Sequence, residues 1–263
     1  MSRSVLMLAA AGLLAVAASR PVPASDGVVL PESVLEYLRV LKFIAGRPAV
    51  GSSLEDLEQP LRRAQAEVGL PETGKLDAAT LEMFGRPRCG VSPGWLGGAS
   101  PRRRRFSTLG SRWSIPVVTY RVLQYSSTLS VAEVDAALSG ALAEISAATR
   151  LRFARALSND TESQVDVSFV DERHGCLSDF SGTVLAHAYA PLDGGDLHVR
   201  ESNDWQEHDV VYIVAHELLH SLGVGHSMKS SALMFPTYRR VLPGVPLLSP
   251  DDVDVLQLLY GKP

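Results

Sequence analysis

Three histidines at fixed spacing place the strongest constraint on how this chain of 263 residues folds. His216 and His220 are four positions apart, so on a helix both imidazoles project from one face and can reach one ion. A helix cannot return His226 to the same point, but Gly223 permits the sharp backbone turn that brings it back. The spacing therefore predicts a helix, a glycine turn and a third ligand around one metal ion.

Zinc is the ion that suits this set of ligands. Three neutral imidazoles leave one position open, where zinc lowers the pKa of water toward ~7 and polarises a carbonyl group. Glu217, beside His216, would accept the proton of that water. The alternative is a pair of histidines on a solvated helix face, but the full five-position pattern rarely arises by chance. The sequence predicts a catalytic zinc site with Glu217 as the base.

The composition is that of a soluble globular protein, with 46% hydrophobic and 21% charged residues. A net charge of -4 gives no basis for nucleic-acid binding. Arg3 and the apolar run over 5–18 predict a secretory signal peptide spanning 1–19. The alternative, a membrane anchor, is disfavoured because the run is too short for a bilayer core of ~30 Å. We expect a secreted, extracellular protein that is a monomer.

Two further motifs carry a resemblance to a known family. Residues 232–238 read Ala-Leu-Met-Phe-Pro-Thr-Tyr, which resembles the methionine turn of metzincin peptidases, with Met234 beneath the metal. Residues 69–81 and the Pro-Arg-Cys-Gly-Val of 87–91 resemble the prodomain of matrix metalloproteinases. With the zinc motif, the chain is similar to this family over nearly all of its length after the signal segment.

The resemblance implies an α+β fold: a metzincin catalytic domain over 106–263, with a twisted, mostly parallel five-stranded sheet and three helices. A small all-α prodomain of three helices would occupy 20–105. No hemopexin domain is expected after Tyr260. Apolar periodicity and capping residues agree with this order. Helices are expected at 32–44, 61–70, 77–84, after Ser130, at 207–222 and after Ser249, and strands at 117–125, 151–157, 165–169, 184–190 and 196–201.

The resemblance also implies latency, with Cys89 in the fourth zinc position. The alternative is an ordinary buried thiol or a bridge to Cys176, the other cysteine of the chain. In the family an aspartate that follows the motif pairs with its arginine, whereas Ser92 and Pro93 stand here. We therefore expect Arg88 to lack its partner and the latent state to be looser.

A basic run on a glycine-rich linker, Arg102 to Arg105, resembles a cleavage site for a furin-type proprotein convertase. Cleavage after Arg105 would give a mature chain that begins at Phe106, and the family implies that the new ammonium pairs with Asp251. The alternative is a solvated charge run. Asn159 lies in an Asn-Asp-Thr sequon and is a candidate glycosylation site.

Three more histidines fall at spacings that resemble the structural zinc site of the family. Cys176 stands where that site has an aspartate, and Asp179 is a fallback ligand. The alternative is a set of ordinary polar side chains. Calcium is not expected, because Ser181, Arg200 and Asn203 replace acids of the family's calcium site. The expected ligands of a second zinc are His174, Cys176, His187 and His198.

The family further implies a substrate pocket. Tyr212 would floor the pocket for the side chain after the cut bond, and Pro236 to Tyr238 would form its outer wall. The alternative is that Tyr212 points into the core. A polypeptide would lie extended along an edge strand at 186–190.

These inferences converge on a zymogen of a secreted zinc endopeptidase. Its expected partners are extracellular proteins, including matrix components such as collagen, an activating convertase and tissue inhibitors of metalloproteinases. One rival is a catalytically silent secreted protein that binds peptides, against which the intact Glu217 argues. The other is a metzincin of another branch, astacin-like or adamalysin-like, but Cys89 in its motif and Ser227 after His226 favour the matrix branch.

Overall fold

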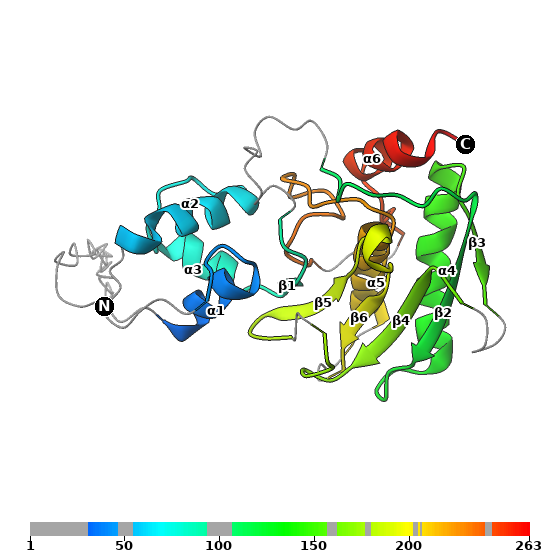
Figure 1. Ribbon diagram of the computed structural model, residues 1–263, viewed down its shortest axis with the longest axis horizontal. Coiled ribbons are helices and arrows are strands. Elements are labelled where there is room, and N and C mark those ends of the chain that lie inside the picture. Colours follow the sequence, from blue (N-terminus) through cyan, green and yellow to red (C-terminus); the bar gives the residue numbers. More distant parts are fainter. Residues whose placement is uncertain are drawn as a thin grey trace, which may run out of the picture.

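The computed structural model describes residues 31–46, 55–93, 107–156, 162–176, 180–201, 205, 207–239 and 244–263. A small helical part at the N-terminal side lies beside a larger part built on a sheet (Figure 1). The predicted signal peptide, the basic run ending at Arg105, the sequon at Asn159 and the residues Asp179 and Asn203 lie outside the described residues.

The helical part contains the three helices that the periodicity predicts. They are α1 (Glu32–Val40), α2 (Glu58–Glu67, preceded by a 3-10 turn at Glu55–Leu57) and α3 (Ala78–Phe84). Helix α1 ends earlier than expected, because Lys42 takes a positive φ of 60° that a helix cannot continue through. Asp77, at the start of the range expected for the third helix, caps α3 by accepting the Thr80 N–H at 2.9 Å. A small core of its own holds this part together, from Leu38, Leu41, Leu61 and Phe84.

The larger part is organised around a six-stranded sheet in the order β1-β5-β6-β4-β2-β3. Its five expected strands are β2 (Val117–Gln124), β3 (Arg152–Arg155), β4 (Val165–Val170), β5 (Val184–Ala188) and β6 (Leu197–Arg200). Every neighbouring pair is parallel except β5 with β6, so the prediction of a mostly parallel sheet is confirmed. The sixth strand, β1 (Arg88–Cys89), comes from the expected prodomain and pairs with β5.

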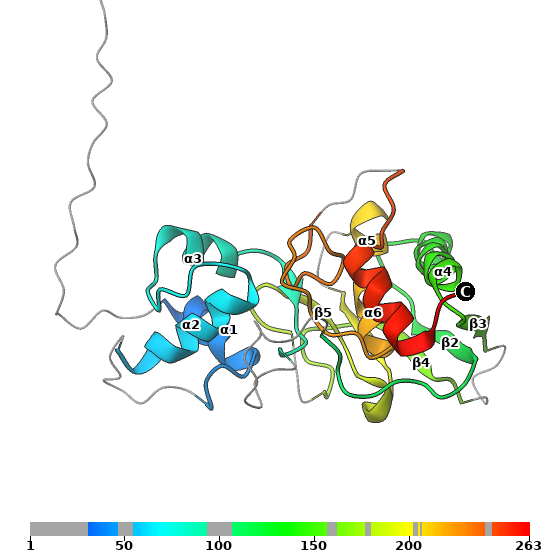
Figure 2. The ribbon, with the colours of Figure 1, turned by 90° about the horizontal axis from the view of Figure 1, so that it is seen from above.

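Three helices accompany the sheet, as expected: α4 (Val131–Ala148), α5 (Glu207–Ser221) and α6 (Pro250–Tyr260), of which α6 is nearest the viewer in Figure 2. Capping boxes open α4 and α6 through Ser130 with Glu133 and Ser249 with Asp252. Residues of α4, α5 and the strands share one apolar core, which fixes the position of α5. Among the described helices, none is long and apolar enough to cross a membrane.

Candidate metal centre and active site

The last two turns of α5 carry the first two predicted ligands. His216 and His220 are fully buried, and the Nδ1 atom of each ring lies 2.8 Å from a backbone carbonyl oxygen, that of Leu233 and that of Val224 respectively. When Nδ1–H donates to a carbonyl, the Nε2 atom keeps its lone pair for a metal. The surrounding backbone thus fixes both imidazoles in the orientation that a zinc ligand needs.

The turn after α5 returns the third ligand, as the glycine predicts. Gly223 has a φ of 89°, and a Cβ atom there would lie 2.0 Å from the Ser111 carbonyl oxygen, so no other residue fits. His226 follows, with its ring centroid 4.7 Å from that of His220 and 5.5 Å from that of His216. The three imidazoles therefore converge on one point.

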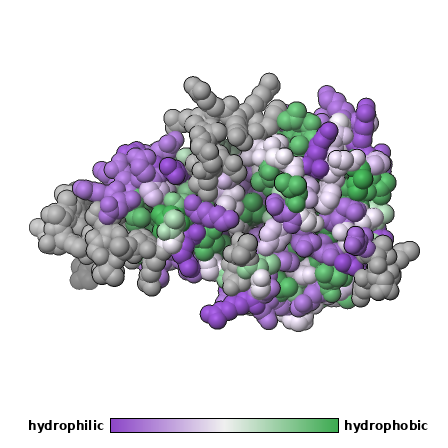
Figure 3. Space-filling model, in the orientation of Figure 1, coloured by the Kyte–Doolittle hydropathy of each residue, from purple (hydrophilic) through white to green (hydrophobic). Residues whose placement is uncertain are grey.

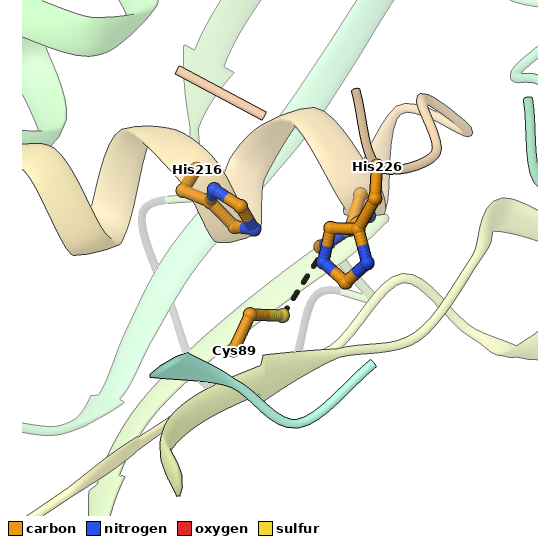
Figure 4. A group of neighbouring side chains, drawn as sticks. Cys89, His216 and His226 are labelled. Carbon is orange, nitrogen blue, oxygen red and sulfur yellow. Dashed lines mark hydrogen bonds between the residues drawn. The ribbon is translucent and has the colours of Figure 1, made fainter. Parts of the chain in front are cut away.

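Cys89 reaches the same point from the helical part of the chain. Its Sγ atom lies 3.4 Å from His220 Nε2, the dashed line in Figure 4. One ligand atom from each of the four residues lies within 4.8 Å of all the others. The Nε2 atoms of His216 and His226 are buried without a hydrogen-bond partner. Buried polar atoms without partners are rare, so this set of three nitrogens and one sulfur fits a tetrahedral zinc ion.

The segment that carries Cys89 is held on both sides. The Cys89 N–H donates to the Pro236 carbonyl at 3.0 Å, and the Gly90 N–H donates to the Ala186 carbonyl at 2.8 Å. If Gly90 carried a side chain, its Cβ atom would lie only 2.8 Å from a Val184 methyl carbon, so the close approach to β5 requires glycine. Residues 88–90 thus occupy the edge of β5, where a substrate was expected to lie.

Arg88 does not lack a carboxylate partner, so that expectation was wrong. Its Nη2 atom lies 3.2 Å from Glu67 Oε1 at the end of α2, and both side chains are buried. The guanidinium also donates to the Tyr37 hydroxyl and, through Nε, to the Cys89 carbonyl oxygen at 2.9 Å. Sequence reasoning missed Glu67 because the family's aspartate follows the cysteine motif directly in the sequence. Glu67 instead comes from α2, 21 positions before Arg88.

Glu217 lies beside the metal ligands and is fully buried. Burial raises the pKa of its carboxyl group to about 7, although a hydrogen bond from the Tyr238 hydroxyl lowers the pKa in part. Burial also raises the pKa of the Cys89 thiol well above its ordinary value, and the neighbouring Glu217 raises it further. A cation bound between these groups acts in the opposite direction and favours the thiolate. The site can hold a proton at neutral pH on either group.

The segment predicted as the methionine turn contacts His216 through the Leu233 carbonyl oxygen, and it is held by a residue that sequence reasoning missed. Met234 is buried, and the backbone N–H groups of Leu233 and Met234 donate to the Asp252 carboxylate at 2.8 and 3.1 Å. Asp252 thereby holds the Leu233 carbonyl that orients His216. The sequence shows Asp252 only as an acidic residue in the first turn of the last helix.

Tyr212 and Tyr238 lie together near this turn. Tyr212 is buried, and its hydroxyl donates to the Leu233 carbonyl at 3.1 Å. Its ring meets that of Tyr238 nearly at right angles, with centroids 6.4 Å apart, and the Arg239 guanidinium lies 5.9 Å from its centre. Of these contacts, only that with Tyr238 involves the segment that was expected to form the outer wall of the pocket; the hydroxyl group of Tyr212 is directed to the backbone at Leu233.

The second predicted cluster also comes together. His198 Nδ1 lies 3.2 Å from both Cys176 Sγ and His187 Nε2, and with His174 the four residues keep their ligand atoms within 4.8 Å of one another. Burial lowers the pKa of His187 to about 3 and that of His198 to about 4, so both rings are neutral, the form that binds metal. Cys176 thus lies with the three histidines as one group that could hold a metal ion.

Arg200 is one of the residues that replace the acids of the family's calcium site. Its guanidinium pairs with Glu172 and donates to the Gly182 carbonyl oxygen at 3.2 Å. A guanidinium thus joins a carboxylate and a carbonyl, which are the groups that a calcium ion would otherwise join.

Asp251, the expected partner of a new N-terminus, has other partners in this uncleaved chain. It accepts a hydrogen bond from the Ser227 hydroxyl at 2.6 Å and pairs with the Lys229 ammonium group. Phe106 lies outside the described residues.

Comparison with known proteins agrees with this geometry. The matrixin family model, of the M10 peptidases, matches residues 112–261, which is more than half of the chain. The chain belongs to the matrixin family. The match covers the whole sheet except β1, all three helices of the larger part and both histidine clusters.

Individual matrixin relatives resemble the chain over a longer stretch. Stromelysin-1 of Mus musculus is 40% identical over 214 residues, 77% of this chain and 43% of the relative. Macrophage metalloelastase of Rattus norvegicus is 36% identical over 215 residues, covering 79% and 44%. Matrix metalloproteinase-18 of Xenopus laevis is 34% identical over 217 residues, covering 80% and 44%. The chain thus spans less than half the length of these relatives.

Proposed function

We propose that this matrixin is the latent form of a secreted zinc endopeptidase that cleaves extracellular proteins. One observation carries the proposal: a cysteine and three histidines direct four ligand atoms to within 4.8 Å of one another, with the buried carboxyl group of Glu217 beside them. The ligand set suits a catalytic zinc, and the thiol is the group that must leave before water and substrate can enter.

His216, His220 and His226 would hold the zinc ion in both the latent and the active form. When bound, zinc supplies a Lewis acid that acidifies water and polarises the peptide carbonyl group. Glu217 would take the proton of the attacking water and pass it to the leaving amine, because its buried carboxyl group lies beside the three histidines. The Tyr238 hydroxyl, which donates to Glu217, holds the carboxylate in place.

The substrate would bind where residues 88–90 lie in the latent chain. The Ala186 carbonyl, which now accepts the Gly90 N–H, and the Pro236 carbonyl, which now accepts the Cys89 N–H, become free when this segment leaves. An extended peptide can then add to the edge of β5 through backbone hydrogen bonds. Extracellular matrix proteins, collagen among them, are the proposed substrates, and tissue inhibitors of metalloproteinases are proposed partners.

The direct test is hydrolysis by the chain that begins at Phe106. We expect it to cleave members of a peptide library, to lose this activity in a zinc chelator and to regain it when zinc is returned. A mature chain that binds zinc but cleaves no peptide would instead support the catalytically silent binding protein.

Activation is proposed to follow cleavage after Arg105 by a proprotein convertase. Changing the block Arg102 to Arg105 to alanine should make cells secrete only the longer chain, because a convertase requires the basic side chains before the cut bond. N-terminal sequencing of the secreted protein measures this. A chain that still begins at Phe106 would rule out the convertase site.

Substrate preference is proposed to depend on Tyr212. In the mature enzyme, Tyr212→Leu should widen acceptance of long aromatic side chains after the cut bond by roughly ten-fold relative to Leu, the range that a change in an apolar pocket gives. Peptides varied at that one position measure the ratio of kcat/KM values. An unchanged ratio would mean that Tyr212 is only a core residue, as its hydrogen bond to Leu233 would then suggest.

The second cluster is proposed to hold a structural zinc ion with Cys176 as its fourth ligand. The purified mature enzyme should contain two zinc ions per chain and no thiol that reacts with a thiol reagent, because a zinc-bound thiolate is protected. Cys176→Asp should keep both ions, and Cys176→Ala should lose one. Metal analysis and thiol titration decide it; one zinc ion with a reactive thiol would contradict the assignment.

A further inference from the structure

Glu67 is a buried residue of the helical part, and its carboxylate lies between the side chains of Arg88 and His226. It is the last residue of α2 and is only 2% exposed. Its Oε1 atom lies 3.2 Å from Arg88 Nη2 and also 3.2 Å from Nδ1 of His226. Burying a carboxylate is costly unless neighbouring donors compensate for the lost water. Glu67 is therefore fixed by one residue of the cysteine segment and one proposed zinc ligand.

His226 differs from the other two histidines in what lies beside its Nδ1 atom. The Nδ1 atoms of His216 and His220 each lie 2.8 Å from a carbonyl oxygen of the larger part. His226 Nδ1 has no aligned hydrogen-bond partner among the described residues, and Glu67 makes the close contact with it. A carboxylate beside the second nitrogen of a zinc-bound histidine sets the ring orientation and strengthens the ligand. For His226 this carboxylate comes from the part of the chain that activation removes.

We propose that Glu67 is a positioning residue of the latent state that acts on both halves of the metal centre. Its carboxylate neutralises the charge of Arg88, which donates a hydrogen bond to the Cys89 carbonyl oxygen at 2.9 Å, and it orients the His226 ring directly. When the helical part leaves, the Cys89 thiol and the Glu67 carboxylate leave the site together. His226 then loses the carboxylate that orients its ring. The proposal rests on the zymogen function proposed above, and it adds a contact to a zinc ligand that pairing with Arg88 alone does not provide.

The test uses the full chain with Arg102 to Arg105 changed to alanine, so that it stays uncleaved. Glu67→Gln keeps the shape of the side chain and removes its charge. We expect zinc transfer to a chromogenic chelator and alkylation of Cys89, followed by mass spectrometry of its peptide, each to become roughly ten-fold faster or more, the usual effect of losing such a partner. Glu58→Gln is the matched control, because Glu58 lies on the same helix, is partly exposed and pairs with Arg62. Figure 3 shows hydrophilic side chains where α2 meets solvent.

A second measurement separates the contact with His226 from the pairing with Arg88. In chains labelled with ¹⁵N-histidine, Glu67→Gln should shift the Nδ1 resonance of His226, whereas Arg88→Met, which leaves Glu67 in place, should shift it much less. Should Glu67→Gln disturb folding by leaving Arg88 buried and unpaired, the double change Glu67→Leu with Arg88→Leu removes both charges, and such replacements commonly preserve stability. The double variant should show the same shift of the His226 resonance.

Two outcomes would overturn the proposal. Equal zinc-transfer rates in Glu67→Gln and Glu58→Gln would mean that Glu67 has no effect on the metal centre. An unshifted His226 resonance would mean that Glu67 serves Arg88 alone. Failure of the proposed function is seen separately, in an unmutated mature chain that holds zinc without cleaving peptides, because the measurements on Glu67 require only that the uncleaved chain binds zinc.

Discussion

Glu217→Gln in the mature enzyme should reduce kcat by roughly 100-fold or more, the usual contribution of general-base catalysis. The substitution keeps the size of the side chain and removes the group that accepts a proton. Glu217 is fully buried beside the three histidines, so nothing else among the described residues of α5 offers a carboxylate at that point. Hydrolysis of a fluorogenic peptide under saturating substrate measures the loss.

Two comparisons make the result on Glu217 specific. Zinc content and thermal unfolding should match those of the parent enzyme, because the three histidines and their backbone partners are unchanged. Glu144→Gln is the matched control: this carboxylate of α4 accepts backbone N–H groups of Leu247 and Leu248 away from the zinc site. Its effect on kcat should stay within roughly two-fold, as for most changes away from a site. A Glu217→Gln enzyme with the parent rate would eliminate the proposed base.

The elements of the fold follow from the sequence because their signals are local. Helix α6 shows this: Ser249 and Asp252 form its capping box, and Pro250 occupies its first turn as the pattern predicts. The same holds for the alternation of β4 and for the positive φ of Gly223. Each of these features depends on residues within a few positions of one another, where periodicity and capping carry information.

Contacts between distant segments did not follow from local patterns in the sequence, and the position of Cys89 beside the histidines came only from the family resemblance. Strand β1 has two residues, too few for any alternating pattern, and it exists because Arg88 and Cys89 find the free edge of β5. Glu67 reaches Arg88 only because α2 packs close to the cysteine segment. The sequence shows that Glu67 is an acid, but it does not show which residue its side chain contacts. That contact is decided by how the helix packs and not by spacing along the helix.

The histidine clusters show both behaviours. The spacing of His216, His220 and His226 identifies a site because one helix and one turn bring them together. The set of His174, Cys176, His187 and His198 lies on three separate segments, and only the resemblance to a family grouped it. The structure places its ligand atoms together through the antiparallel register of β5 and β6, in which His187 lies opposite His198.

Cys89→Ser should give peptidase activity to the uncleaved chain in which Arg102 to Arg105 are alanine. A hydroxyl group binds zinc far more weakly than a thiolate, so the latent state loses its fourth ligand. A loss of about 3 kcal/mol would raise the population of open chains, and hence the rate, by roughly 100-fold. The rate should still fall short of that of the mature enzyme, because the backbone bonds of Cys89 to Pro236 and of Gly90 to Ala186 keep the segment on the edge of β5.

Cys176→Asp in the same uncleaved background is the matched control for Cys89→Ser. It removes the other thiol of the chain but keeps a ligand for the second zinc ion, and it leaves β1 and the catalytic ligands in place, so latency should persist. If the uncleaved Cys89→Ser chain stays as inactive as its parent while it binds zinc, the thiol is not what keeps it latent. Occupation of the β5 edge by residues 88–90, fastened through Arg88 and Glu67, would then account for latency, because it excludes a substrate whether or not zinc has a fourth protein ligand.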